Sequence, residues 1–342
     1  MKIDSFISVG ENIHCTRIFK VDGLFCKPDA EGNYQIYYKT TSGKASMAVP
    51  THFTEGADWA AGKVKHCAVA IWLGANGTPE QQEAGKQYLR NLAAQQEAAG
   101  ATYLDINVDE YSTDVAERVR LMQWTVNVVQ GAVKIPMSID SSNLEILEAG
   151  LAACDKDRGR PMVNSVSLER TDAIEVAREA HAVVVASAAG AGGLPNAVEE
   201  RMHNIEAIHG RLMAAGFEDG DIHFDPLVFP ISTDGENGIR FLDTVKAIRG
   251  RFGKAVHIVA GLSNISFGMP NRKRINQVYT WLCCEAGGDG GIVDPMQINI
   301  EILNGLDPQS QPFKLARDLL LGEDEYGMAY IAAAREGLLD GE

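Results

Sequence analysis

Short runs rich in β-branched residues alternate along this chain with longer segments in which apolar residues recur every three or four positions. The short runs predict eight strands, at 3–9, 102–107, 135–140, 161–166, 182–187, 222–225, 256–260 and 290–293. The longer segments predict helices near 79–99, 113–131, 143–153, 172–180, 196–215, 238–251 and 272–286, and then near 311–321 and 326–338. Eight strands with intervening helices favour a closed α/β barrel, the (β/α)8 or TIM barrel, over an open doubly wound sheet.

Residues 19–68 break this alternation. The turn sequences Asp22-Gly23 and Ser42-Gly43 flank stretches with strand character, such as 34–38. We therefore expect an insertion of β-hairpins between the first strand and the first helix, projecting over the mouth of the barrel. The remaining chain shows no low-complexity linker, so we predict a single domain over 1–342, with the insertion at about 19–68 and C-terminal helices at about 311–339.

Composition limits the partners that this chain is expected to have. Apolar residues make up 45% and charged residues 23%, as in soluble globular enzymes, and the net charge of −15 disfavours nucleic acid and membrane surfaces. Met1 leads directly into the first expected strand, so we expect no secretory signal and a cytoplasmic location. The six cysteines include no C-x-x-C pair and no zinc-ligand spacing, so we expect no metal bound by this chain, and Cys283 and Cys284 buried in a helix.

Polar signatures stand at the carboxyl ends of six expected strands. They are Gly10-Glu11-Asn12-Ile13-His14, Leu104-Asp105-Ile106-Asn107, Ser138-Ile139-Asp140-Ser141-Ser142-Asn143, Val163-Asn164-Ser165, His223-Phe224-Asp225-Pro226 and Gly261-Leu262-Ser263-Asn264-Ile265-Ser266-Phe267-Gly268. A single signature of this kind is explained by helix caps and turns. Six such signatures, at strand ends that follow the order of the expected barrel, indicate that their Asp and Asn side chains face one cavity.

The same signatures exclude several chemistries and favour one class of ligand. They contain no nucleophile elbow, no H-E-x-x-H and no strand-end lysine for a Schiff base. A carboxylate accepts two adjacent N–H groups, and an asparagine offers a donor beside an acceptor. A ring of Asp and Asn with few cations therefore suits a neutral heterocycle with adjacent N–H donors, such as a pterin.

As an ordered set, these signatures resemble those of the pterin-binding methyltransferases. That family includes methyltetrahydrofolate–corrinoid methyltransferases and the folate-binding module of cobalamin-dependent methionine synthase, with dihydropteroate synthase as a more distant relative. The resemblance covers the first strand and roughly residues 78–300, and it leaves out the insertion. It implies a barrel of the dihydropteroate synthase-like type, tetrahydrofolate or 5-methyltetrahydrofolate as substrate, cobalamin or another corrinoid on a partner protein, and a homodimer.

The resemblance also implies roles for individual residues. Asp140, Asn164 and Asp225 match positions that hydrogen-bond the pterin ring, and Asn264 matches the catalytic asparagine near nitrogen-5. Less defined pocket roles fall to Glu11, Asn12, Asp105, Asn107, Ser141 and Arg272. The implied reaction is an in-line methyl displacement, in which a hydrogen bond from Asn264 strengthens as charge develops on nitrogen-5. The resemblance does not set the direction of transfer.

Two alternative functions share parts of this pattern. Dihydropteroate synthase is expected to carry a Ser-Arg-Lys-type signature after the seventh strand, but the sequence there reads Ser263-Asn264-Ile265. A folate-binding accessory subunit without turnover fits poorly with the full set of strand-end residues. Since the chain shows no Asp-x-His-x-x-Gly cobalamin motif, we expect a separate corrinoid protein to dock at the barrel mouth. The insertion would shape that contact, or serve as a lid or dimer arm.

Overall fold

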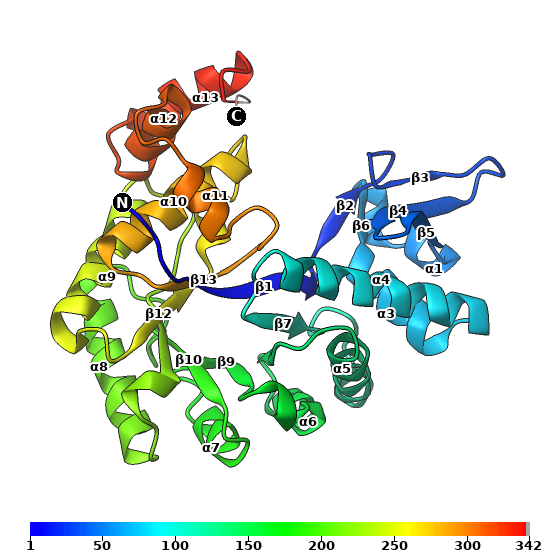
Figure 1. Ribbon diagram of the computed structural model, residues 1–342, viewed down its shortest axis with the longest axis horizontal. Helices are drawn as coiled ribbons and strands as arrows, with labels where there is room; N and C mark the ends of the chain where they lie inside the picture. The colour runs from blue at the N-terminus through cyan, green and yellow to red at the C-terminus, as the bar shows by residue number, and fades with distance from the viewer. Residues whose placement is uncertain (340–342) are drawn as a thin grey trace. The chain divides into compact units, whose positions relative to one another are not determined.

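The computed structural model describes residues 1–339, and Figure 1 traces its elements. Eight strands form a closed barrel in the order β1-β13-β12-β11-β10-β9-β8-β7. The strands are β1 (Ile7–His14), β7 (Tyr103–Asn107), β8 (Met137–Asp140), β9 (Met162–Val166), β10 (Val183–Ser187), β11 (Ile222–Asp225), β12 (His257–Ala260) and β13 (Gly290–Val293). The predicted (β/α)8 barrel is confirmed, and seven of the eight predicted strands agree with the observed bounds to within two residues.

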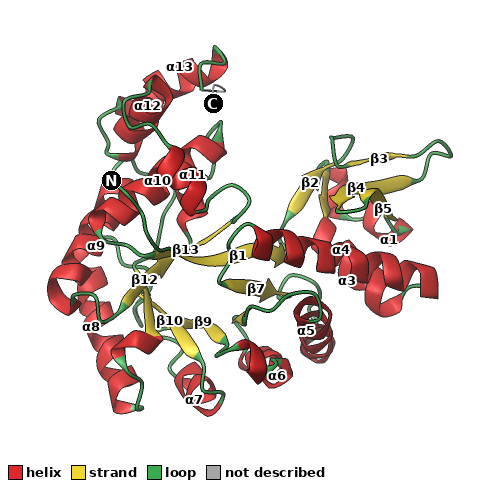
Figure 2. Ribbon diagram, in the orientation of Figure 1, coloured by secondary structure: helices red, strands yellow, loops and turns green. Residues whose placement is uncertain are grey.

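The predicted helices are confirmed as well (Figure 2). They are α4 (Pro79–Ala98), α5 (Val115–Gln130), α6 (Leu144–Ala153), α7 (Asp172–Glu179), α8 (Val198–Ala214), α9 (Asn237–Phe252), α10 (Arg272–Ala286), α12 (Gln311–Leu320) and α13 (Met328–Arg335). The sequence did not predict α3 (His66–Asn76) or α11 (Ile300–Gly305). Most of α3 is buried, so it lacks the polar face from which an amphipathic helix is detected.

The first strand lies four residues further along the chain than predicted. Residues 3–9 were expected, but β1 runs from Ile7 to His14. The prediction that Glu11, Asn12 and His14 follow the strand is therefore wrong, since all three are part of it. Polar residues are tolerated inside this strand because other groups satisfy them: Glu11 pairs with Arg17, and His14 contacts Asp140.

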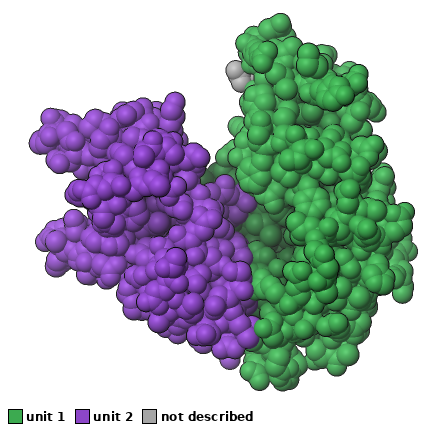
Figure 3. All heavy atoms as spheres, turned by 180° about the vertical axis from the view of Figure 1, so that it is seen from behind, with its two compact units in different colours: residues 1–10, 99–103, 162–342 green, residues 11–98, 104–161 purple. Residues whose placement is uncertain are grey.

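The chain divides into two compact units, coloured separately in Figure 3. Unit 1 comprises Met1–Gly10, Ala99–Tyr103 and Met162–Glu342, and unit 2 comprises Glu11–Ala98 and Leu104–Pro161. Both units supply strands to the barrel. The single domain over residues 1–342 stays a prediction. The two units are described separately below.

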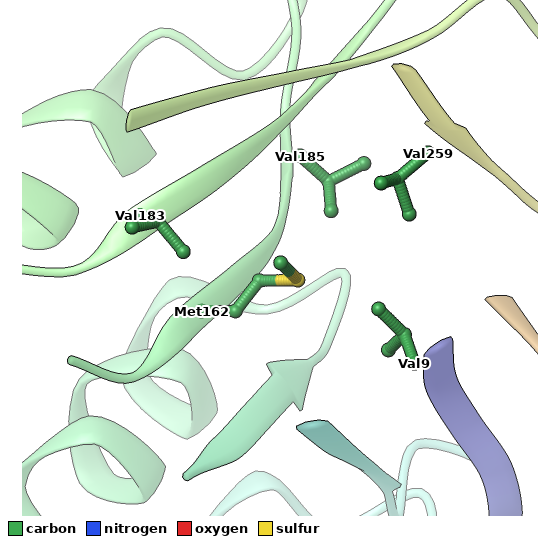
Figure 4. Close-up of a cluster of buried hydrophobic side chains, with 5 residues drawn as sticks. All are labelled: Val9, Met162, Val183, Val185 and Val259. Atoms are coloured by element: carbon green, nitrogen blue, oxygen red, sulfur yellow. The ribbon is translucent and has the colours of Figure 1, made fainter. Parts of the chain in front are cut away.

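The core of unit 1 is built from strand residues that point inward. Val9, Met162, Val183, Val185 and Val259 are buried, and Figure 4 shows their side chains turned toward one another. Branched side chains of this kind fill the interior of such barrels in layers. Gly290 on β13 permits the close approach of neighbours, because a Cβ there would lie 2.6 Å from the Val259 Cγ2 atom.

The insertion belongs to unit 2 and contains the predicted hairpins. An antiparallel sheet forms from β3 (Cys26–Pro28), β4 (Tyr34–Thr40) and β5 (Gly43–Ala48), and β2 (Ile18–Lys20) pairs with β6 (Lys63–Lys65). The short helices α1 (Thr51–Thr54) and α2 (Ala57–Ala60) complete it.

Contacts at two places hold the insertion within unit 2. The three-stranded sheet packs on α4, where the Asn91 side chain donates to the Lys39 carbonyl at 2.8 Å and the Tyr38 ring meets Tyr88 edge-on. The ribbon of β2 and β6 reaches the loop after β7 through an ion pair of 3.0 Å between Lys65 and Glu110. The sheet thus covers an outer helix, while the base of the insertion contacts a strand-end loop.

Among residues 1–339, none of the helices combines the length and the apolar character that a membrane span requires.

Candidate functional site

In unit 2, polar side chains gather around Asp140, the last residue of β8. Asn107, the last residue of β7, donates from its Nδ2 to the Asp140 Oδ2 atom at 3.0 Å. His14 Nε2 lies 3.5 Å from the same oxygen. Both contacts fall on Oδ2, and Oδ1 makes no hydrogen bond within residues 1–339. Asp140 is therefore held in place with one oxygen still able to accept.

The orientation of His14 follows from its second ring nitrogen. The backbone N–H of Thr16 donates to Nδ1 at 3.1 Å, so a neutral His14 carries its proton on Nε2. Burial lowers the pKa of His14, but the hydrogen bond to Asp140 and the charges of Asp140 and Asp105 outweigh it, and the net pKa is raised. In either protonation state, His14 donates a hydrogen bond toward Asp140.

Other predicted pocket residues of unit 2 support the loops around Asp140. The Asp109 carboxylate accepts from the Ser141 hydroxyl at 2.6 Å and from the Ser142 backbone N–H at 2.7 Å, which orders the turn after β8. Asp105 is buried and accepts from Ser138 at 2.6 Å. These contacts give Ser141 and Asp105 a role in shaping the strand ends.

The remaining two predicted residues of this unit lie on β1. Glu11 forms an ion pair of 2.5 Å with Arg17. Asn12 is buried, and its backbone N–H donates to the side chain of Gln96 on α4 at 3.1 Å. All six predicted residues of this part of the chain belong to unit 2, namely Glu11, Asn12, Asp105, Asn107, Asp140 and Ser141, and among them a direct hydrogen bond joins Asn107 to Asp140.

In unit 1, the strand-end carboxylate is Asp225, the last residue of β11. Its Oδ1 accepts from the backbone N–H of Leu227 at 2.8 Å, and Leu227 adopts the left-handed conformation (φ 68°) that turns the chain back. Burial raises the pKa of Asp225 to about 6, although the Leu227 N–H and the charge of Arg201 act to lower it. Asp225 itself is half-buried, and a carboxylate with few donors fits a ligand that brings N–H groups to it.

Asn264 lies in the short 3-10 helix η3 (Leu262–Ser266), which follows β12. Its side chain folds back over Gly261, where a Cβ would lie only 3.0 Å from the Asn264 Nδ2 atom. The amide is partly exposed and makes no side-chain hydrogen bond within the described part of the chain. Both its donor and its acceptor are therefore available to a ligand.

Arg272, the first residue of α10, holds the loop that carries Asn264. Its Nε donates to the Ser266 hydroxyl at 2.9 Å and its Nη2 to the Ser263 carbonyl at 3.1 Å. The guanidinium also lies over the Phe267 ring, 4.4 Å from the centroid. These contacts give Arg272 a structural role beside Asn264.

Asn164 lies within β9 and is partly buried. It stands opposite Val185 of β10, at the point where the register between the two strands shifts. The four predicted residues of unit 1 are thus Asn164 and Asp225 on strands of the barrel, Asn264 in the 3-10 helix after β12, and Arg272 at the start of α10.

Sequence reasoning missed Arg201 on α8. Its side chain is fully buried (0% exposed), and Nε, Nη1 and Nη2 have no hydrogen-bond partner among the described residues. The guanidinium lies 5.2 Å from the centroid of the Phe229 ring. The run Glu199-Glu200-Arg201 has the pattern of a solvated helix face, so no signal in the sequence indicates that Arg201 is buried. Asp109 was missed too, although its place two residues after Asn107 could have indicated it.

Residues 1–339 contain no group of three or more His, Cys, Asp or Glu side chains placed to hold a metal ion. Cys283 on α10 is buried as expected, whereas Cys284 is partly exposed.

Comparison with solved structures concerns the fold. A dihydropteroate synthase from Stenotrophomonas maltophilia superposes with a TM-score of 0.52 at 19% identity, over 66% of this chain and 86% of that one. The enzyme from Xanthomonas albilineans in complex with 7,8-dihydropteroate gives a TM-score of 0.50 at 17% identity, over 67% and 85%. Both confirm a barrel of the dihydropteroate synthase-like type.

Comparison of sequences identifies the family. A methylcorrinoid:tetrahydrofolate methyltransferase from Eubacterium limosum is 32% identical over 263 residues, which span 75% of this chain and 90% of the relative. The model of the pterin-binding enzymes matches residues 76–294, the stretch that contains β7 to β13. On these matches, with the strand-end Asp and Asn residues in place, the chain belongs to the family of pterin-binding enzymes.

Proposed function

We propose that this chain is a methyltransferase that moves a methyl group between nitrogen-5 of tetrahydrofolate and the cobalt of a corrinoid carried by a partner protein. The proposal rests on the similarity of this chain to a methylcorrinoid:tetrahydrofolate methyltransferase. The two sequences are 32% identical over a stretch that spans 90% of that relative. The name of that relative favours transfer from the methylcorrinoid to tetrahydrofolate. A homodimer stays a prediction from the resemblance, and a cytoplasmic location stays a prediction from the sequence.

The resemblance assigns hydrogen bonds to the pterin to residues of each unit. In unit 2, Asp140 offers its Oδ1 atom while Asn107 and His14 fix Oδ2. In unit 1, Asp225 has the Leu227 N–H as its hydrogen-bond donor and can accept the amino and ring N–H groups of a pterin. Asn164 supplies the amide that the resemblance assigns to the same ring.

Asn264 would act on nitrogen-5. Its amide oxygen accepts the N–H of tetrahydrofolate, which leaves the nitrogen lone pair free to attack the methyl carbon. As the new N–C bond forms and the bond to cobalt breaks, both electrons of that bond stay on the corrinoid, and nitrogen-5 releases its proton to water. In the reverse direction, the amide N–H donates to nitrogen-5 of 5-methyltetrahydrofolate. An amide does not itself transfer a proton, so the role is orientation and charge stabilisation.

The test couples folate binding to corrinoid absorbance. Calorimetry measures the affinity for tetrahydrofolate and 5-methyltetrahydrofolate, and the corrinoid spectrum then follows transfer with methylcob(III)alamin or cob(I)alamin. We expect Asn264→Ala to slow transfer by about 100-fold, the usual cost of one such hydrogen-bond donor, with a smaller effect on folate affinity.

The matched control is Asn127→Ala, an exposed asparagine on α5, which should leave both measurements unchanged. Wild-type protein that binds no folate contradicts the proposal. Equal transfer rates in Asn264→Ala and wild type contradict the role of Asn264.

A further inference from the structure

The buried guanidinium of Arg201 is unusual among the charged groups of unit 1. A charge removed from water is tolerated in a fold when acceptors or opposite charges compensate it. Arg201 has no hydrogen-bond acceptor among the described residues and contacts the face of the Phe229 ring instead. Helix α8 would pack as well with a long apolar side chain at this position, so the charge itself calls for an explanation.

Three ionisable groups from three elements lie within electrostatic range of Arg201. They are Asp225 at the end of β11, Tyr279 on α10 and Arg240 on α9. Burial raises the pKa of Tyr279 well above its usual value, so its phenol is neutral, and its hydroxyl donates to the Gly238 carbonyl at 3.3 Å. Arg240 is engaged by Asp234 and Glu236. Asp225 is thus the group whose negative charge responds to Arg201.

Chain geometry ties the two residues to each other. Phe229, whose ring the guanidinium covers, follows Asp225 by four residues in the same strand-end loop. The left-handed turn at Leu227 lies between them and supplies the N–H that Asp225 accepts. Arg201 therefore contacts the loop that begins at Asp225.

We propose that Arg201 is a positioning residue for Asp225: its buried guanidinium keeps that carboxylate ionised, so that it can accept two N–H groups of the pterin. An ionised carboxylate only accepts, whereas a protonated one presents an O–H that opposes a ligand N–H. A bound ligand removes the remaining water from Asp225, which disfavours its charge further and makes a fixed positive partner more important. The inference rests on the proposed function, because it assumes that the ligand of Asp225 is a pterin.

The pKa of Asp225 agrees with this role. The pKa of Asp225 is raised to about 6, with burial as the largest cause, while the Leu227 N–H and the charge of Arg201 act to lower it. Removal of the guanidinium would therefore move the pKa closer to neutrality.

The experiment is a pH titration of tetrahydrofolate affinity by anaerobic calorimetry, from pH 5.5 to 9, on wild type, Arg201→Met and Arg201→Lys. We expect the pH at which tetrahydrofolate affinity is half-maximal to rise by about one unit in Arg201→Met. This is the lower end of the effect of a nearby opposite charge on a pKa. Affinity would then be about fivefold weaker than wild type at pH 6 and equal to it at pH 9. Arg201→Lys, which keeps the charge, should restore the wild-type midpoint.

Two controls separate this role from a structural one. In an Asp225→Asn background, Arg201→Met should leave the midpoint unmoved. In ligand-free protein, carbon-13 NMR of the Asp225 carboxyl should show a higher pKa in Arg201→Met, and Arg201→Gln replaces that variant if it does not fold. An affinity loss that is equal at every pH, or an unchanged carboxyl pKa, overturns the inference. Wild type that binds no folate at any pH, together with the expected rise in the carboxyl pKa, overturns the proposed function alone.

Discussion

Unit 1 contains two carboxylates, Asp289 and Asp225, at opposite ends of its strands, and an arginine acts on each of them. The two sites differ in how many hydrogen-bond partners each carboxylate has. Asp289 immediately precedes β13 and accepts from His257 Nδ1 at 2.8 Å, Arg249 Nη2 at 2.8 Å and the Ile258 N–H at 2.7 Å. Burial raises the pKa of Asp289, but these partners outweigh it and the net pKa is lowered. Asp225 ends β11, has the Leu227 N–H as its donor, and has a pKa raised to about 6.

The two arginines differ in the same way. Arg249 donates to the carbonyls of Gly287, Gly253 and Val256 as well as to Asp289. Arg201 is more deeply buried and has no hydrogen-bond partner among the described residues. Closed networks at the amino ends of barrel strands stabilise the fold, whereas unsatisfied groups at the carboxyl ends are available to a ligand. The comparison predicts that the same substitution will have opposite effects at the two sites.

The largest expected difference is in folate affinity. Asp225→Asn should weaken tetrahydrofolate binding by about 100-fold at pH 8, because it replaces two charge-assisted hydrogen bonds with one neutral bond and one mismatched donor. Asp289→Asn should leave the affinity unchanged. Calorimetry measures the tetrahydrofolate affinity of both variants. Equal losses of affinity in the two variants would contradict the proposed difference between the sites.

The free energy of unfolding should change more on substitution of Asp289 than on substitution of Asp225. Asp289→Asn should lower the free energy of unfolding by about 2 kcal/mol at pH 7, less than for a fully buried pair because Asp289 is partly exposed. The folded-state pKa of Asp289 is lowered, so its contribution is present above the unfolded value of 3.8 and is lost as pH falls through the folded pKa. Urea unfolding of wild type and variant should therefore converge in acid. A difference that persists undiminished at pH 3 would contradict this account.

The smallest expected effect has the opposite sign. Asp225→Asn should raise the free energy of unfolding by about 1–2 kcal/mol at pH 8, because asparagine can still accept from Leu227 without a buried charge. The folded pKa of about 6 exceeds the unfolded value of 3.8, so the favourable contribution of Asp225 is present below 3.8 and lost as pH rises through 6. The gain should disappear near pH 4. Thermal unfolding at the two pH values tests this, and a variant less stable than wild type at pH 8 would show that Asp225 supports the fold.

The sequence predicted the barrel well because strand and helix periodicities are local properties. It misplaced β1 because Glu11 and His14 are satisfied by Arg17 and Asp140, and a pattern of apolar residues contains no information about such partners. Asp225 and Asn264 could be singled out because strand-end position is itself a sequence feature. Arg201 could not, since its burial depends on residues such as Phe229 and Tyr279 that lie far away along the chain.

The central claim is methyl transfer, and the most direct measurement is the fate of an isotopically labelled methyl group. Methyl-labelled methylcob(III)alamin, free or on a corrinoid protein, is incubated with tetrahydrofolate and the wild-type enzyme, and the products are identified by mass spectrometry. The account predicts labelled 5-methyltetrahydrofolate, formed about 100-fold more slowly by Asn264→Ala. If folate binds but no label moves in either direction, or if the enzyme instead forms dihydropteroate from a pterin pyrophosphate and 4-aminobenzoate, the claim is contradicted.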